Sequence, residues 1–190
     1  MSEQKTLHVD AAYWDRGWRN VPDMTGARRL LDAPDLREIA AALVIELPLR
    51  DVLDVGCGTG RAAQVCTSYV GTDIAPSAIE YCERKKIPAM LMTGSHDLPP
   101  GQFQTVLCIS VFTHMGRDER RAYLAAFARK ADELIADIII GDGTGDVAVW
   151  TAVREEFEAD LREAGYVHSH PVDFQWDDHV HSYYFAEQVA

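Results

Sequence analysis

Residues 52–60 read VLDVGCGTG, an apolar run that leads into three glycines separated by single residues. This pattern predicts a buried strand that ends in a tight turn and opens a helix. Gly56, Gly58 and Gly60 allow the backbone to turn sharply and to approach a ligand closely, because no Cβ intrudes. The stretch therefore predicts a ligand-binding loop after a strand of an α/β domain.

An acidic residue supports this interpretation of the loop. Asp73 ends the next predicted strand, 17 residues after Gly56, where a carboxylate can accept hydrogen bonds from both hydroxyls of a ribose. Arg61 stands directly after Gly60, so the spacing is G-x-G-x-G and not the G-x-G-x-x-G of a dinucleotide site. No G-x-x-x-x-G-K-[ST] phosphate loop occurs in the chain. The residues favour a ligand that has a ribose but no phosphate.

Predicted strands and helices alternate around the loop. The strands are predicted at 51–55, 68–74, 89–93, 105–112 and 134–140, and the helices at 34–47, 61–67, 76–85, 117–131 and 151–164. A short helix or loop is expected at 11–19. This alternation indicates βαβ units and a parallel sheet. The extended segments 166–176 and 180–187, joined around Asp177 and Asp178, predict a terminal antiparallel hairpin.

Composition narrows the class of protein. The chain has 190 residues, 47% of them apolar, which suits one domain with a sizeable core. Its net charge is −12, and residues 131–190 hold 14 acidic but only 2 basic side chains. No segment is strongly basic, so we expect no nucleic-acid partner, because nucleic acids are held mainly through cationic contacts to phosphate.

The sequence also bears on location. The N-terminus MSEQKTLHVD has no apolar core, and polar residues interrupt 98–116, the longest stretch without Asp, Glu, Lys or Arg. We therefore expect neither secretion nor a membrane partner. The four cysteines form no C-x-x-C pair, and we expect a cytoplasmic protein with reduced thiols.

Four stretches resemble motifs of a known family: VLDVGCGTG at 52–60, VGTDIAPSAIEYCE at 70–83, HDLP at 96–99 and FQTVLCISVFTHM at 103–115. Together they are similar to the class I S-adenosylmethionine-dependent methyltransferases of the small-molecule type. The family implies a Rossmann-like α/β fold, with a seven-stranded sheet of order 3-2-1-4-5-7-6, strand 7 antiparallel and helices on both faces. It implies one domain over 1–190, with an N-terminal lid or cap in 1–33, a cofactor-binding core in 34–140, and a substrate-side helix and hairpin in 141–190.

The resemblance implies S-adenosylmethionine as cofactor and assigns expected contacts to it. The amino-acid end of the cofactor is expected against Gly56, Cys57, Gly58 and Gly60. Asp54 orders that loop or reaches the amino group, Asp73 holds the ribose, and Ile74 lies against the adenine. Further contacts are expected from Trp14, Ser95, His96, Asp97 and Ser110. The stretch 94–99 is one residue shorter than the frequent family pattern, so either Ser95 or Asp97 meets the adenine.

His114 and Asp142 are the candidate catalytic residues. His114 follows the fourth strand at the ligand-binding edge and could act as a base near neutral pH; alternatively it caps the next helix or packs. Asp142, with Asp146, either faces solvent or orients a cationic substrate at an acidic rim. The aromatic residues Tyr13, Trp14 and Trp18 predict a lid over the site, or a helix packed on the core.

The predicted hairpin holds several potential metal ligands: His168, His170, Asp173, Asp177, Asp178, His179 and His181. Residues two apart in a strand share a face, so His168 with His170, or His179 with His181, could present paired imidazoles. Mixed histidine and aspartate in a hairpin more often form solvated surface, and we expect no metal.

The sequence thus predicts methyl transfer from S-adenosylmethionine to an O or N nucleophile of a small molecule, which could bear an amine. The alternative is a non-catalytic S-adenosylmethionine-binding regulator or scaffold. The small-molecule acceptor is the expected partner, and the sequence leaves the oligomeric state open.

Overall fold

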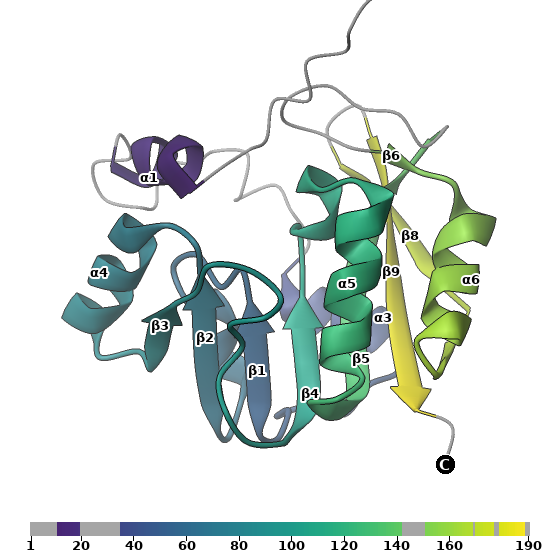
Figure 1. Cartoon of the computed structure of the whole chain (residues 1–190). Helices are drawn as coiled ribbons and strands as arrows, with labels where there is room; N and C mark the ends of the chain where they lie inside the picture. The colour runs from purple at the N-terminus through teal and green to yellow at the C-terminus, as the bar shows by residue number, and fades with distance from the viewer. Residues whose placement is uncertain (1–10, 20–34, 142–150, 169, 177–178, 189–190) are drawn as a thin grey trace, which may run out of the picture.

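A nine-stranded sheet forms the centre of the computed structural model, which describes residues 11–19, 35–141, 151–168, 170–176 and 179–188 (Figure 1). The strands are β1 (Val52–Val55), β2 (Tyr69–Asp73), β3 (Ala89–Leu91), β4 (Phe103–Cys108), β5 (Ala131–Ile140), β6 (Thr151–Ala152), β7 (Tyr166–His168), β8 (Val172–Trp176) and β9 (His179–Gln188). The helices are α1 (Ala11–Arg19), α3 (Leu36–Ala42), α4 (Pro76–Lys85), α5 (Arg117–Phe127) and α6 (Arg154–Glu163), with 3-10 helices η1 (Arg61–Val65) and η2 (Phe112–His114).

The order of the sheet confirms the prediction. It runs β3-β2-β1-β4-β5-β9-β7, and β9 is antiparallel to β5 whereas the pairs from β3 to β5 are parallel. β7 and β9 are therefore the sixth and seventh strands of the expected pattern. Two short additions extend it, because β6 pairs with β5 in parallel and β8 pairs with β9.

The C-terminal strands correct one prediction. The hairpin is confirmed, since Trp176 pairs with His179 across the turn, and the turn residues themselves lie outside the described residues. The segment 166–176 is not one strand but two, β7 and β8, both paired with β9. His168 pairs with Ala186 and Val172 with Tyr183, so the outer strand carries one extra residue, as in a β-bulge.

Several predicted element bounds were also wrong. The helix predicted at 117–131 ends at Phe127, because β5 already begins at Ala131. The helix predicted at 34–47 ends at Ala42, because Val44 has a φ of 59° and leaves the helical region. The helix predicted at 151–164 begins at Arg154, because Thr151 and Ala152 pair with β5. The strand predicted at 105–112 ends at Cys108, so Ser110 lies in the following loop rather than at a strand end.

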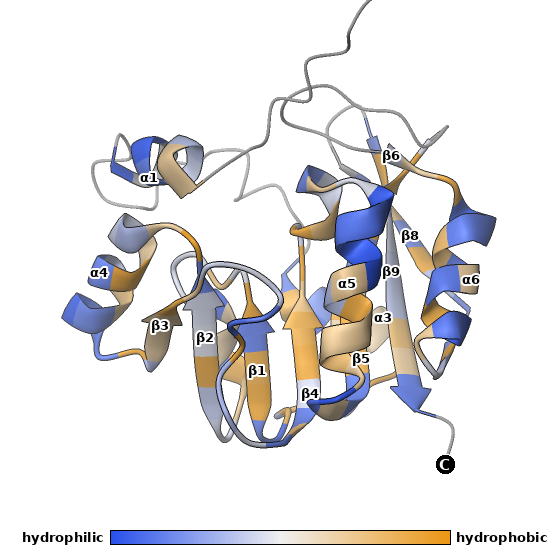
Figure 2. Ribbon diagram, viewed as in Figure 1, coloured by the Kyte–Doolittle hydropathy of each residue, from blue (hydrophilic) through white to orange (hydrophobic). Residues whose placement is uncertain are grey.

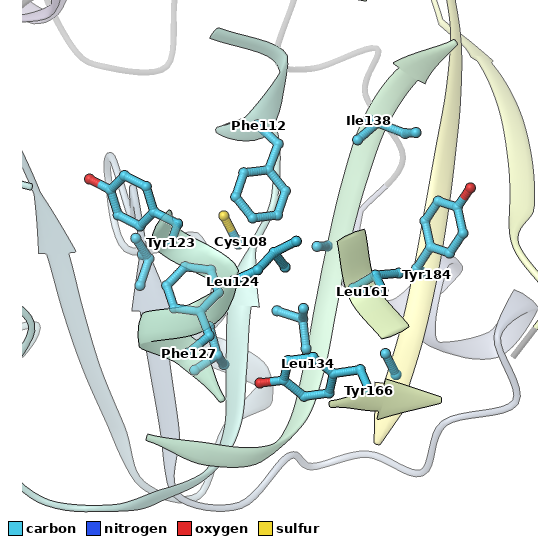
Figure 3. Packing of buried hydrophobic residues seen from close by; sticks show 14 of the residues in the cluster. Cys108, Phe112, Tyr123, Leu124, Phe127, Leu134, Ile138, Leu161, Tyr166 and Tyr184 are labelled. Carbon is cyan, nitrogen blue, oxygen red and sulfur yellow. The ribbon is translucent and has the colours of Figure 1, made fainter. Parts of the chain in front are cut away.

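Alternating side chains on the strands build two apolar layers. Leu53, Val106 and Leu134 belong to the layer under α5 and α6, whereas their strand neighbours Val52, Leu107 and Ile135 belong to the layer with α3 and α4. Figure 2 shows β1, β4 and β5 as largely apolar and the exposed sides of α4 and α6 as hydrophilic. Figure 3 shows Tyr123, Leu124 and Phe127 gathered beside Leu134 and Phe112.

None of the helices in the described ranges is long and apolar enough to cross a membrane.

Candidate active site

The Gly-rich loop lies at the carboxyl end of β1, at the edge where open α/β sheets bind ligands. Its glycines have positive φ values of 75° at Gly56, 52° at Gly58 and 69° at Gly60. A Cβ on Gly56 would lie 2.2 Å from Cγ2 of Val111. The Gly56 amide donates to the Thr72 carbonyl at 2.7 Å. Glycine at position 56 is therefore required by space as well as by conformation.

Asp73 and the loop form one hydrogen-bonded unit. One carboxylate oxygen accepts the Gly58 amide at 2.9 Å, and the other accepts the Ala75 amide at 2.8 Å. Asp73 is only 6% exposed, and burial raises its pKa while the bound amides lower it. Each carboxylate oxygen can still accept a further hydrogen bond, so a vicinal diol fits this acid.

Asp54 lies beneath the loop, where its carboxylate accepts the Tyr69 hydroxyl at 2.7 Å. Burial raises the pKa of Asp54 to about 7, against the hydrogen bond from Tyr69. A Cβ at Gly71 would lie 2.9 Å from the Tyr69 hydroxyl and 2.7 Å from Sγ of Cys57. The sequence analysis did not single out Tyr69 or Gly71. A glycine inside a predicted strand indicates that another group approaches the backbone closely, and Gly71 was such a glycine.

The loop after β3 holds the three candidates for the adenine. Asp97 accepts both the amide and the hydroxyl of Thr93, at 3.2 and 3.1 Å. Its carboxylate thus closes a local turn. Ser95 is partly buried, whereas His96 is exposed. The choice between Ser95 and Asp97 stays a prediction, with Asp97 already engaged in the turn.

The segment after β4 packs directly against the Gly-rich loop through Val111. It begins at Ser110, whose φ is 58° and whose amide donates to Asp137 at 2.5 Å. It ends in η2, where the partly buried His114 lies. This contact brings the candidate base to the same edge of the sheet as the candidate cofactor residues.

Helix α1 bridges this edge. The Trp14 ring lies 4.6 Å from the His114 ring, measured between centroids. Asp15 accepts the Ser77 amide at 2.9 Å, and the Ser77 hydroxyl donates to the Asp15 carbonyl at 3.2 Å. Figure 1 shows α1 above the start of α4. The Trp18 side chain lies outside what the structure describes. Helix α1 thus contacts both His114, after β4, and Ser77, at the start of α4, so it can act as a cover over the site.

We expect Asp15→Ala to speed the release of S-adenosylhomocysteine by about two- to tenfold, the value of one or two net hydrogen bonds. The Arg19 side chain, followed by Ser77, holds the pKa of Asp15 down at about 2. The effect should therefore be constant from pH 5 to 9. Stopped-flow displacement measures it, with the exposed Glu83 of α4 changed to Ala as control. An unchanged release rate in Asp15→Ala would contradict a role for α1 as a cover.

Three of the described histidines and acids of the hairpin have separate partners. His168 lies 3.9 Å from Glu158, Asp173 binds Arg154 at 2.9 Å, and His181 binds Asp137 at 2.8 Å. No group of three or more potential metal ligands occurs within the described residues. The candidates Asp142, Asp146, Asp177 and Asp178 lie outside those residues.

Residues 52–132 match a family model described as a methyltransferase domain. The matched residues run from β1 to the start of β5 and include the Gly-rich loop, Asp73 and His114. No curated protein matches the chain in sequence.

Solved structures match over most of the chain. Magnesium protoporphyrin IX methyltransferase from Synechocystis PCC 6803 with bound SAH has a TM-score of 0.73 at 18% identity, over 97% of this chain and 98% of that one. The DhpI–SAM–HEP complex has a TM-score of 0.73 at 12% identity, over 98% and 100%. The [4+2]-cyclase SpnF has a TM-score of 0.64 at 15% identity, over 85% and 81%. At these identities the likeness is one of fold. Over residues 52–132 the chain is similar to the methyltransferase-domain family, and along most of its length it has the fold of these solved structures.

Proposed function

We propose that this protein transfers the methyl group of S-adenosylmethionine to an O or N nucleophile of a small molecule. The observation that carries the proposal is the unit of Asp73 and the Gly-rich loop, joined through the Gly58 amide. It offers a diol acceptor beside a close backbone approach, and the loop sequence at 56–61, GCGTGR, contains no lysine. The segment 110–114 packs beside it and supplies a titratable side chain.

The residues suit the parts of this cofactor. Asp73 can accept both ribose hydroxyls, because each oxygen has one acceptor site left beside its backbone donor. The loop 56–60, which includes Cys57 and has Asp54 beneath it, would hold the amino-acid end. Ile74 would lie against the adenine, with Ser95, His96 or Asp97 at its amino group. Ser110 would lie beside the methionine portion, and Trp14 would cover the site.

Bound S-adenosylmethionine supplies an electrophilic methyl group on a positively charged sulfur. The chain's own task is then to hold the acceptor in line at near-attack distance and to exclude water, which α1 can do. A protonated nucleophile also needs a base. His114 would take that proton at a ring nitrogen, since its ring contacts Trp14 and its amide is bonded to Val111, which packs on the Gly-rich loop.

We expect His114→Gln to lower kcat by about 10²-fold or more, the usual size of a general-base contribution. The affinity for S-adenosylmethionine should change little, because glutamine keeps much of the volume under Trp14. His170→Gln, at an exposed position between β7 and β8, is the matched control. Turnover of His114→Gln within a few-fold of wild type, with cofactor affinity intact, would rule out His114 as base.

The acceptor can be sought by its chemistry. Two similar proteins are named for, or were solved with, small compounds, and the net charge of −12 would favour a cation. An amine-bearing acceptor with Asp142 orienting it is the form we propose. The test is a transfer screen with labelled S-adenosylmethionine over matched amines, phenols and carboxylates. Preferred turnover of amines supports this form, and equal turnover of acidic aromatics contradicts it.

The same screen addresses the non-catalytic alternative. The fold is shared by a protein named as a [4+2]-cyclase, so a site of this shape does not by itself require methyl transfer. A protein that binds the labelled cofactor tightly but never releases the label to any acceptor would act as a regulator or scaffold.

A further inference from the structure

A buried aspartate and histidine face each other inside the sheet. Nδ1 of His181 lies 2.8 Å from Oδ2 of Asp137. Asp137 is fully buried on β5, and His181 on β9 is 3% exposed. His181 pairs in register with Ile139, one residue before the end of β5. The pair therefore lies near the carboxyl edge of the sheet, close to the proposed active site.

The pair holds a strained backbone position. The second oxygen of Asp137, Oδ1, accepts the amide of Ser110 at 2.5 Å. Ser110 has a φ of 58°, a left-handed conformation that residues other than glycine rarely adopt. In the tautomer of His181 that carries its proton on Nδ1, this ring nitrogen donates and the carboxylate oxygen accepts. Asp137 is thus fixed from one side by His181 and fixes Ser110 on the other.

Stability alone is a poor reason for such a pair. The loss of hydration on burial offsets most of the attraction between an aspartate and a histidine, and apolar residues of similar size often do as well. The neighbouring positions Ile135 and Tyr183 on the same face of the sheet are indeed apolar or aromatic. The role of the pair is better explained by the backbone position that it holds in place, at Ser110.

Ser110 begins the segment that contacts both halves of the proposed site. The next residue, Val111, packs against Gly56 so closely that a Cβ there would come within 2.2 Å. The amide of His114 donates to the carbonyl of Val111 at 2.9 Å. A shift at Ser110 would therefore move the candidate base and the wall of the Gly-rich loop together.

We propose that His181 is a positioning residue of the methyl-transfer site. By donating to Asp137 it holds that carboxylate against the Ser110 amide, and so it sets segment 110–114 against the Gly-rich loop. This inference rests on the proposed function, because the segment matters only if the loop binds the cofactor. It also links β9 of the C-terminal hairpin to the cofactor side of the domain.

Two amide substitutions separate positioning from packing. In His181→Asn the side-chain amide can place an N–H where Nδ1 lies, whereas in His181→Gln the amide lies where Nε2 lies. Calorimetry with S-adenosylhomocysteine is expected to give a dissociation constant within about twofold of wild type for Asn. For Gln and for His181→Ala it should rise about tenfold, which corresponds to about 1.4 kcal/mol.

Ile138→Ala is the control for lost packing. Ile138 is the next residue on β5, it is buried in the opposite layer (Figure 3), and its side chain points away from Asp137. Ile138→Ala should lower the melting temperature and leave the affinity for S-adenosylhomocysteine unchanged. Equal affinities for Asn and Gln would overturn the proposal, as would a loss in Ile138→Ala as large as in His181→Ala. If His181→Ala does not fold, the Asn and Gln comparison still decides. A wild-type protein that binds no S-adenosylhomocysteine would instead overturn the proposed function itself.

Discussion

Asp73→Asn is expected to weaken the binding of S-adenosylhomocysteine by about 100-fold. Two backbone amides, from Gly58 and Ala75, already donate to the carboxylate, and a ribose diol would bring two more donors. Asparagine has only one side-chain oxygen to accept from these four donors. Its NH₂ group faces the remaining donors and cannot accept from them. Hydrogen bonds to a charged group are worth about 1.5–3 kcal/mol each, so the loss of one to two accounts for the expected change.

Asp51→Asn is the matched control for the lost charge. Asp51 is an exposed acid directly before β1, so it lies at the edge of the sheet away from the loop. Its φ is 47°, a value that asparagine tolerates. Calorimetry should find its affinity equal to wild type. An affinity of Asp73→Asn within threefold of wild type would exclude Asp73 as the ribose acceptor.

The sequence predicted the Gly-rich loop and its neighbour Asp73 because their determinants are local. Gly56, Gly58 and Gly60 follow an apolar strand directly, and positive φ values leave glycine as the favoured residue. Asp73 ends the strand that pairs with β1, so periodicity alone brings it to the loop. The same reasoning gave α4 its bounds without error, from a proline at its start and basic residues at its end.

The contacts that the sequence did not predict depend on tertiary pairing. His181 and Asp137 are 44 residues apart, and only the antiparallel register of β9 on β5 brings them together. From the sequence, His181 resembled a surface residue of a polar hairpin. The early end of the strand before Ser110 has the same cause, because its left-handed backbone depends on a carboxylate from another strand. The early end of α3 at Ala42 is a local feature that apolar spacing did not reveal.

Asp54→Asn is expected to stabilise the protein increasingly as the pH rises. Burial raises the pKa of Asp54 from its ordinary 3.8 to about 7, so the folded state binds this proton more tightly than the unfolded state does. Its contribution to stability is full below pH 3.8 and is lost as the pH rises through 7. Asparagine is neutral throughout and can still accept from Tyr69. Denaturant unfolding should therefore show the variant gaining on wild type by about 4 kcal/mol between pH 4 and pH 8. Parallel stability curves for the two proteins would contradict this.

The same substitution should act on binding in the opposite direction. The amino group of S-adenosylhomocysteine is cationic, and a cation near the Gly-rich loop favours the ionised form of Asp54. Wild-type affinity should then strengthen as the pH rises through 7, whereas the affinity of Asp54→Asn should not follow that rise. At pH 8 the variant should be the more stable protein and the weaker binder. That combination is expected only if the buried acid serves the ligand, because a carboxyl that merely ordered the loop would make stability and affinity change together.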